Sequence, residues 1–195
     1  MLAVNAGVDA IGLNFWESSK RFVTVTQAQQ ICAQLPPFVT VVALFVNADA
    51  AEIEQIIQRV PVDLLQFHGD EEAPFCRQFN KPYLKALRMR ADIDVAAAAI
   101  HYSDATGLLL DAYREGVPGG TGERFEWQRI PLQLRAKITL AGGLTAANVA
   151  EAVTAVRPYS VDVSGGVEYS AGVKEAAKIE QFVAAVGAAD RLAKS

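Results

Sequence analysis

Seven short apolar runs are spread along the chain and are separated by longer stretches of mixed polarity. The runs are rich in Val, Ile, Leu and Phe, and most show no alternation of apolar and polar positions. This pattern is typical of strands buried on both faces of a parallel sheet. The predicted strands are Ala10–Asn14, Val39–Val46, Leu64–Phe67, Tyr83–Leu87, Leu108–Leu110, Ile138–Leu140 and Val161–Val163.

Several of the intervening stretches carry apolar residues at helical spacing. The clearest sets are Ala28, Ile31, Cys32 and Leu35; Ile53, Ile56, Ile57 and Val60; and Ile179, Phe182, Val183 and Val186. Thr26 and Thr145 are the expected N-caps, and the pair Pro36–Pro37 is expected to end a helix at Leu35. Strands that alternate with helices predict right-handed βα crossovers and a parallel sheet.

The fold class is therefore α/β, and both a doubly wound sheet and a (β/α)8 TIM barrel fit the pattern. We favour the barrel, because residues suited to chemistry follow several different strands instead of meeting at one switch point. A barrel needs eight strands and only seven can be counted. The chain opens like the tail of a helix with a turn at Gly7, so strand 1 and most of helix 1 are expected to be missing. No linker divides residues 1–195, which predicts a single domain.

Composition narrows the class of function. The formal net charge of −4 argues against a broad surface for nucleic acid or for an anionic membrane. No apolar run is long enough to span a bilayer, and the first residues do not resemble a signal peptide, so we expect a cytoplasmic protein. Cys32 and Cys76 show neither metal-ligand nor disulfide spacing and are expected to be small core residues on helices.

Glycine pairs follow the last two predicted strands. Gly142 and Gly143 stand in "LAGGL", and Ser164 and Gly165 stand in "DVSGGVE", where a single glutamate precedes an expected helix. Glycine lets the backbone approach a ligand closely, and exposed N–H groups beside a helix N-terminus bind phosphate. In barrels the loops after strands 7 and 8 often form such a site. The alternative is that both pairs are tight turns without a ligand.

Four other side chains are candidates for chemistry. Asp111 ends "GLLLD" and suits a general acid or base, or else a loop-anchoring carboxylate. His68 ends "LLQFH" and could contact substrate, move a proton or bond to its own loop. Arg21, in "ESSKRFV", could bind a carboxylate or be a solvated charge. Lys85 interrupts an apolar strand and is expected to pair with a carboxylate such as Asp162.

Taken together, these segments resemble the phosphoribosylanthranilate isomerase family of tryptophan biosynthesis. The resemblance runs from about Ala6 to Val186 and rests on "SKRFV", "PPFVTVVALFVN", "LLQFHGDE", "LLLDAY", "PGGTGERFEW", "LAGGLTAANV" and "VRPYSVDVSGGVE", in that order. It implies a (β/α)8 barrel that converts N-(5′-phosphoribosyl)anthranilate into the 1-deoxyribulose isomer by an Amadori rearrangement, without a cofactor or metal. The glycine-rich residues 112–127 are expected to form a lid or binding loop.

The resemblance also implies roles for single residues. Asp111 is implied to be the general acid, and Arg21 is implied to bind the anthranilate carboxylate. His68 matches a substrate-binding histidine. Gly142, Gly143, Ser164 and Gly165 match the phosphate loops. The implied partner is a small phosphosugar, with neither nucleic acid nor membrane, and the implied assembly is a monomer or a homodimer.

Two features depart from the family pattern. Ser164-Gly165-Gly166 stands where many members have Ser-Ser-Gly, which removes one hydroxyl donor. More seriously, the family's general base is a cysteine in a Lys-Ile-Cys-Gly motif, and this chain has no such motif. The alternative function is therefore a catalytically impaired phosphosugar-binding or assembly protein. A ribulose-phosphate epimerase or an indole-glycerol-phosphate synthase is a third possibility, but the chain has only two histidines, too few for the metal-dependent epimerase.

Overall fold

The computed structural model describes residues 1–112 and 126–193, so the expected lid over 112–127 lies almost entirely outside the described residues. The chain divides into two compact units. Unit 1 comprises Met1–Ala86 with Asp104–Thr106, and unit 2 comprises Leu87–Ser103 with Gly107–Ser195. The single domain expected for residues 1–195 stays a prediction.

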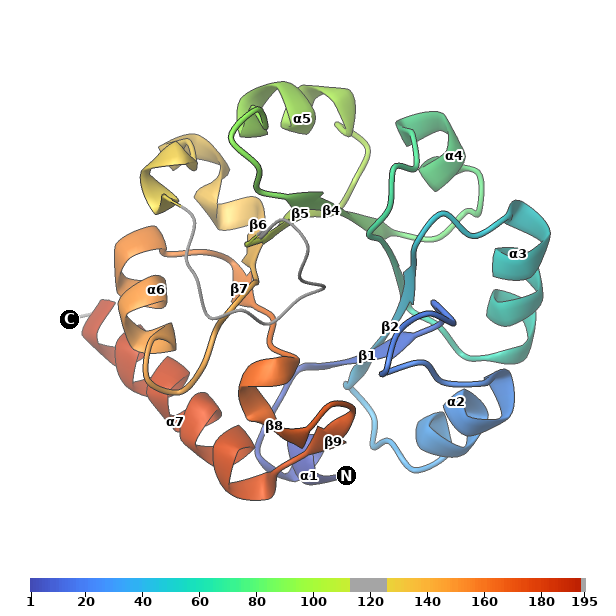
Figure 1. The fold of residues 1–195 in the computed structure, drawn as a ribbon, viewed down its shortest axis with the longest axis horizontal. Helices are drawn as coiled ribbons and strands as arrows, with labels where there is room; N and C mark the ends of the chain where they lie inside the picture. Colours follow the sequence, from blue (N-terminus) through green and yellow to red (C-terminus); the bar gives the residue numbers. More distant parts are fainter. Residues whose placement is uncertain (113–125, 194–195) are drawn as a thin grey trace. The chain divides into compact units, whose positions relative to one another are not determined.

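Unit 1 is built on parallel strands that pair in chain order (Figure 1). The strands are β1 (Ala10–Asn14), β2 (Thr40–Phe45), β3 (Leu64–Phe67) and β4 (Tyr83–Arg88), the last of which ends in unit 2. The predicted strands match these to within one residue at either end. The agreement follows from burial on both faces: most residues of β2 and β3 are buried, so nearly every position must be apolar.

The helices of unit 1 are α1 (Leu2–Asn5), α2 (Val25–Cys32), α3 (Ala50–Arg59) and α4 (Ala73–Arg77). The expected N-cap Thr26 is wrong, because Thr24 caps α2. Its hydroxyl accepts from Gln27 N, and the Gln27 side chain accepts from Thr24 N, which forms a capping box. The helix also ends at Cys32 and not at Leu35, so the proline pair lies in the loop beyond the helix.

An aromatic cluster fixes the carboxyl end of β3. The Phe67 ring is fully buried and stacks on Phe79 at 5.9 Å between ring centroids, and it meets the edge of Tyr83 at 5.8 Å. Phe45 lies 6.3 Å away on the neighbouring strand. Large aromatic rings contribute much of the buried apolar area of a core. His68 directly follows Phe67, so its backbone starts from a residue that is fixed by several aromatic contacts.

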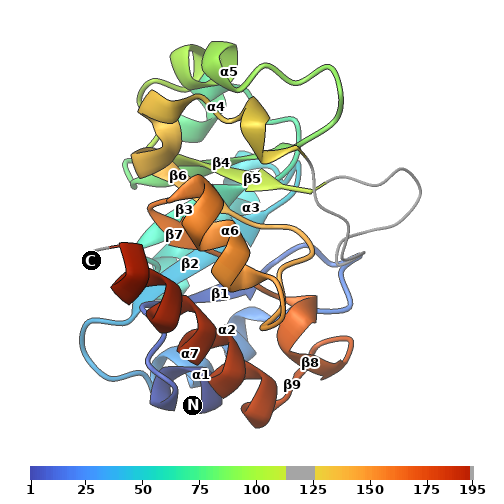
Figure 2. The ribbon, with the colours of Figure 1, turned by 90° about the vertical axis from the view of Figure 1, so that its left-hand side faces the viewer.

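Unit 2 continues the same alternation of parallel strands and helices. Its elements are α5 (Val95–His101), β5 (Gly107–Asp111), β6 (Ile138–Leu140), α6 (Val149–Val156), β7 (Ser160–Val161) and α7 (Ala176–Ala193), with 3-10 turns at Trp127–Arg129, Leu132–Lys137 and Gly165–Val167. Strands β5, β6 and β7 pair in parallel in chain order. Helices α6 and α7 pack side by side (Figure 1, Figure 2).

Two expectations for unit 2 are corrected. Helix α6 begins after Asn148 and not after Thr145, because three residues of turn separate the glycine loop from the helix. The glutamate after Gly166 is not followed directly by a helix. It begins a short antiparallel hairpin of β8 (Glu168–Ser170) and β9 (Val173–Lys174), and α7 starts only at Ala176 (Figure 2). Gly172, with a φ of +83°, makes the tight turn of this hairpin.

The described residues thus form α/β structure in both units, with the strands of each unit paired in parallel. The absence of the barrel's first strand stays a prediction. Over residues 1–112 and 126–193, no helix combines the length and apolar character needed to cross a membrane.

Candidate active site

The candidate residues follow the carboxyl ends of different strands. In unit 1, Arg21 lies on the loop after β1 and His68 directly follows β3. In unit 2, Asp111 is the last residue of β5, Gly142 lies two residues after β6, and Ser164 lies three residues after β7. Active sites of barrel enzymes are built from loops at this end of the strands.

Asp111 and Gly142 are in direct contact. Gly142 has a φ of +82°, and a Cβ added to it would lie 2.6 Å from Asp111 Oδ1 and would overlap the backbone nitrogen of Ala112. Only glycine allows both this conformation and this approach. The half-buried carboxyl group of Asp111 is thus held against the backbone of the first glycine loop.

A buried asparagine that was not expected from the sequence shapes this first loop. Asn148 is buried, its Nδ2 donates to Gly143 O at 2.9 Å, and its Oδ1 accepts from Thr145 N at 2.8 Å. Gly143 itself has a φ of +64°. One amide therefore holds both ends of a three-residue turn, and the signal for it in the sequence was an asparagine three residues after a threonine at a helix start.

The second glycine loop packs directly on the first. A Cβ added to Gly166 would lie 3.0 Å from the carbonyl carbon of Leu144 and closer still to its oxygen. Leu144 immediately follows Gly143, so the close approach joins the two loops. Gly166 is required for this contact, whereas Gly165 begins a 3-10 turn and needs no left-handed conformation.

The two loops offer backbone donors. Apart from bonds within helices and strands, no described backbone–backbone hydrogen bond of residues 1–112 and 126–193 has the N–H of Gly143, Gly165 or Gly166 as its donor. Clustered backbone N–H groups of this kind suit an anion with several oxygens, because they supply donors without a counter-charge. The chemistry that fits these loops is recognition of a phosphate group.

A lysine ties the second loop to the hairpin behind it. Lys174 Nζ donates to Ser164 O at 2.9 Å and to Glu168 Oε1 at 3.0 Å. The Glu168 side chain is only 4% exposed, while the Lys174 side chain is 39% exposed. The hairpin that replaces the expected helix therefore acts as a brace for the Ser164 backbone.

In unit 1, the loop that carries Arg21 is organised by its polar residues. Ser19 Oγ accepts from Asn14 Nδ2 and from Arg21 N, both at 3.1 Å. Val23 N donates to Asn14 O at 2.9 Å, which returns the chain to the end of β1. The half-buried Arg21 is thus placed by its backbone at the same edge of the unit 1 sheet as His68.

His68 is half-buried and is held by both backbone and side chain. Its N–H donates to Phe45 O on β2 at 2.9 Å, and its Nδ1 lies 3.2 Å from Gln66 Nε2. Gln66 is buried on β3. Gln66 was not expected to have a role, although it is the one polar residue within "LLQF" and lies two residues before His68, on the same face of the strand.

A buried ion pair supports the turn after His68. Lys85 pairs with a carboxylate, as expected, but the partner that the structure shows is Glu71 and not the residue named from the sequence: Lys85 Nζ lies 2.8 Å from Glu71 Oε2, and each side chain is only 3% exposed. Lys85 Nζ also donates to Gly69 O at 2.7 Å, and the Glu71 carboxylate accepts from the N–H groups of Gly69 and Asn47. A pairing between Lys85 and Asp162 stays a prediction, since Asp162 belongs to unit 2.

The two cysteines are protonated thiols at neutral pH. Burial raises the pKa of the Cys76 thiol to about 12, and Cys76 is fully buried on α4. Burial, followed by the nearby Asp63 carboxylate, also raises the pKa of Cys32, which is half-buried at the end of α2. A thiol must lose its proton to act as a base. Neither cysteine is therefore suited to that role.

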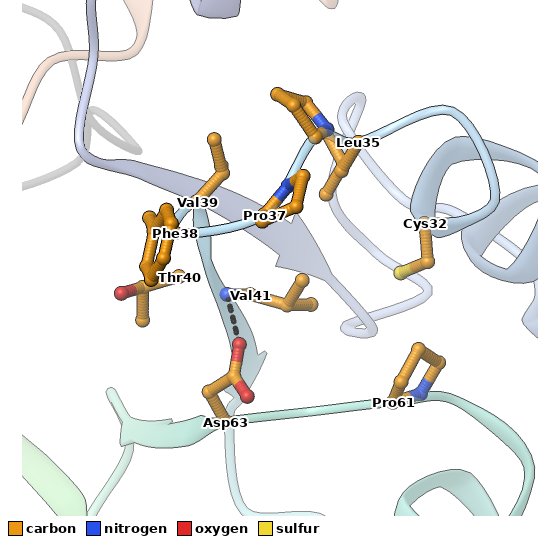
Figure 3. Close-up of a pocket in the computed structure, with 10 residues that line it drawn as sticks. Cys32, Leu35, Pro37, Phe38, Val39, Thr40, Val41, Pro61 and Asp63 are labelled. Atoms are coloured by element: carbon orange, nitrogen blue, oxygen red, sulfur yellow. Dashed lines mark hydrogen bonds between the residues drawn. The ribbon is translucent and has the colours of Figure 1, made fainter.

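The groove in Figure 3 lies at the other end of β2. It has a volume of about 720 Å³ and is lined by apolar residues including Leu35, Pro37 and the fully exposed Phe38. Asp63 Oδ2 accepts from Val41 N at 2.8 Å on its wall (Figure 3). The groove surrounds the start of β2, whereas Arg21 and His68 lie where the strands end. It is not the candidate active site.

No cluster of three or more His, Cys, Asp or Glu side chains in the described ranges could hold a metal ion.

The model of the family described as "N-(5'phosphoribosyl)anthranilate (PRA) isomerase" matches residues 1–185. The chain belongs to this family. An N-(5'-phosphoribosyl)anthranilate isomerase of Pseudomonas fluorescens is 58% identical over 186 residues, which cover 95% of this chain and 89% of the relative.

Solved structures of phosphoribosylanthranilate isomerases share the fold. The enzyme from Thermotoga maritima matches with a TM-score of 0.87 at 33% identity, over 96% of this chain and 92% of that chain. A second structure, a complex with reduced 1-(o-carboxyphenylamino)-1-deoxyribulose 5-phosphate, has a TM-score of 0.83 at 32% identity and covers 96% of this chain and 91% of that chain. The phosphoribosylanthranilate isomerase family comprises enzymes of TIM-barrel type that serve tryptophan biosynthesis.

Proposed function

We propose that this chain is an isomerase that converts N-(5′-phosphoribosyl)anthranilate into 1-(2-carboxyphenylamino)-1-deoxyribulose 5-phosphate. Family membership supports the reaction. The observation that carries the site is the contact between Asp111 and Gly142, which places a carboxyl group against a loop suited to phosphate. We place the enzyme in the cytoplasm, where two unpaired cysteines are compatible with a reducing environment, as a monomer or a homodimer.

In this proposal each candidate residue has one task. Asp111 in its acid form protonates the furanose ring oxygen and opens the ring to an imine. Arg21 binds the anthranilate carboxylate through its guanidinium, and His68 contacts the substrate by hydrogen bonding. The N–H groups of Gly142, Gly143, Ser164 and Gly165 form the binding region for the 5′-phosphate. Binding of the 5′-phosphate by loops that adjoin Asp111 would hold the sugar carbons near the acid.

The second proton step requires a base. Removing the proton from the neighbouring sugar carbon gives an enolamine, and the family motif assigns this step to a cysteine in Lys-Ile-Cys-Gly. That motif does not occur in these 195 residues, and both Cys32 and Cys76 are protonated thiols on helices. A barrel completed by a first strand that carries this motif would supply the base.

The first prediction concerns the activity of the chain itself. Mixed with N-(5′-phosphoribosyl)anthranilate, the 195-residue chain should remove the anthranilate fluorescence faster than the uncatalysed reaction. A fusion that adds a family first strand with its cysteine before Met1 should be faster by about 10²- to 10⁴-fold, the usual contribution of a general base. A fusion in which alanine replaces that cysteine is the control for folding. Equal rates for all three proteins would contradict the proposed base, and binding without turnover in all of them would favour the impaired binding protein.

The hydrogen bond from Lys174 to the Ser164 carbonyl is expected to support phosphate binding. Lys174→Met should raise the KM for the phosphosugar by about 3- to 10-fold with little change in kcat, because the Ser164 carbonyl loses its anchor. Lys178→Met is a matched control. The Lys178 side chain is similarly exposed, is ion-paired with Glu175 and donates to Glu168 O of the hairpin, but it has no described bond to Ser164. If the two variants show the same KM, the brace has no role in phosphate binding.

A further inference from the structure

Only one of the two nitrogens of His68 faces Gln66. The amide nitrogen Nε2 of Gln66 lies 3.2 Å from His68 Nδ1. The two residues stand two positions apart at the end of β3, so their side chains leave the strand on the same face. Gln66 is 7% exposed, so water competes little with His68 for the hydrogen bond to its amide.

The chemistry of this pair determines where the imidazole carries its proton. An amide NH₂ group can donate a hydrogen bond but cannot accept one. With the Gln66 amide oriented as in this structure, Nε2 toward the ring, His68 Nδ1 is the acceptor and its lone pair is directed at Gln66. In the neutral imidazole the other nitrogen, Nε2, carries the hydrogen.

The backbone at His68 is held on both sides, which fixes the point from which the ring extends toward Gln66. His68 N donates to Phe45 O, which ties the residue to β2. On the other side, the Glu71 carboxylate accepts from Gly69 N at 2.9 Å and Lys85 Nζ donates to Gly69 O at 2.7 Å. A Cβ on Gly69 would lie 2.8 Å from Asn47 N, so the turn also packs closely on the loop after β2.

We propose that Gln66 is a positioning residue that holds neutral His68 as the Nε2–H tautomer, so that His68 donates from Nε2 to an oxygen of the substrate. The inference rests on the proposed function for the identity of the substrate, and it extends that function by assigning the direction of the hydrogen bond. An acceptor oxygen, such as a sugar hydroxyl or a carboxylate oxygen, satisfies this donor. A substrate group that can only donate would find no acceptor at Nε2.

The tautomer can be measured without any turnover. Long-range ¹H–¹⁵N correlation spectra at alkaline pH, where the imidazole is neutral, distinguish a protonated Nε2 from a protonated Nδ1. The chain has two histidines, so His101→Asn assigns the His68 signals. We expect the Nε2–H form in the unaltered protein and the Nδ1–H form in Gln66→Glu, because a carboxylate can only accept. An Nδ1–H form in the unaltered protein, or the same tautomer in both proteins, would overturn the assignment.

Steady-state kinetics then test the consequence for the substrate. Gln66→Met has a similar volume and no donor, and it should lower kcat/KM by about tenfold, as expected for one weakened hydrogen bond. Gln66→Asn, which retains an amide on a shorter side chain, should show a smaller loss. Unchanged kcat/KM in Gln66→Met would overturn the role in substrate binding. A protein inactive in every form would count against the proposed function, while the spectra would still decide the tautomer.

Discussion

Replacing Asp111 with asparagine should lower kcat by about 10²- to 10⁴-fold while binding of a product analogue stays nearly unchanged. The amide has the same shape as the carboxyl group and fits the same space beside Gly142. It cannot deliver a proton to the ring oxygen, so the ring-opening step loses its acid. Single-turnover fluorescence measures the rate, and titration with a reduced product analogue measures the binding.

The effect must be distinguished from a change in folding. Asp92→Asn is a suitable control, because Asp92 is 72% exposed in the same unit and lies outside the strand ends. It should leave both kcat and binding as they are. The protein with the Asp111 substitution should also unfold at the same denaturant concentration as the unaltered chain. Parallel loss of rate and binding in Asp111→Asn would show that Asp111 anchors the loop instead of acting on the substrate.

Lys85→Met should reduce the free energy of unfolding by about 3–5 kcal/mol, the usual cost of removing one partner of a buried ion pair. The substitution leaves Glu71 as a charged group that is only 3% exposed, although it still accepts from Gly69 N and Asn47 N. Exposed charges have no such penalty, because water replaces the lost partner. Denaturant unfolding followed by far-ultraviolet circular dichroism measures the difference.

Two comparisons make the result specific to the buried pair. Arg90→Met removes a partner from the exposed Arg90–Asp92 pair and should change stability by less than about 1 kcal/mol. The double variant Lys85→Met with Glu71→Gln should recover part of the loss, because glutamine removes the unpaired buried charge and keeps one of the two oxygens that accept from Asn47 N and Gly69 N. A cost for Lys85→Met no greater than that for Arg90→Met would show that the pair contributes little.

Strands β2, β3 and β5 were predictable because most of their residues are buried, which leaves little freedom in their composition. For β1, β3 and β6, the first and last residues predicted from the sequence are the ones that the structure shows. Helix ends depend on a few local hydrogen bonds instead. Thr24 and Thr26 both precede apolar residues, and only the reciprocal bonds with Gln27 select Thr24 as the cap.

The residues that hold the candidate site in place were harder to predict than the candidate residues themselves. Asp111 and His68 follow apolar strands, and this position identifies them from the sequence. Gln66, Asn148 and Lys174 act through hydrogen bonds whose partners depend on loop geometry that no periodicity encodes. The hairpin of Glu168–Lys174 was missed for a different reason: strands of three and two residues are too short to show a detectable alternation.

The close approach of Gly166 to Leu144 has a consequence for redesign of the enzyme. Because there is no room for a methyl group between Gly166 and Leu144, the positions of the loops after β6 and β7 depend on each other. A substitution selected to reshape one loop for a different anion would displace the other. Evolution or engineering of a new specificity at this site therefore has to change both loops together.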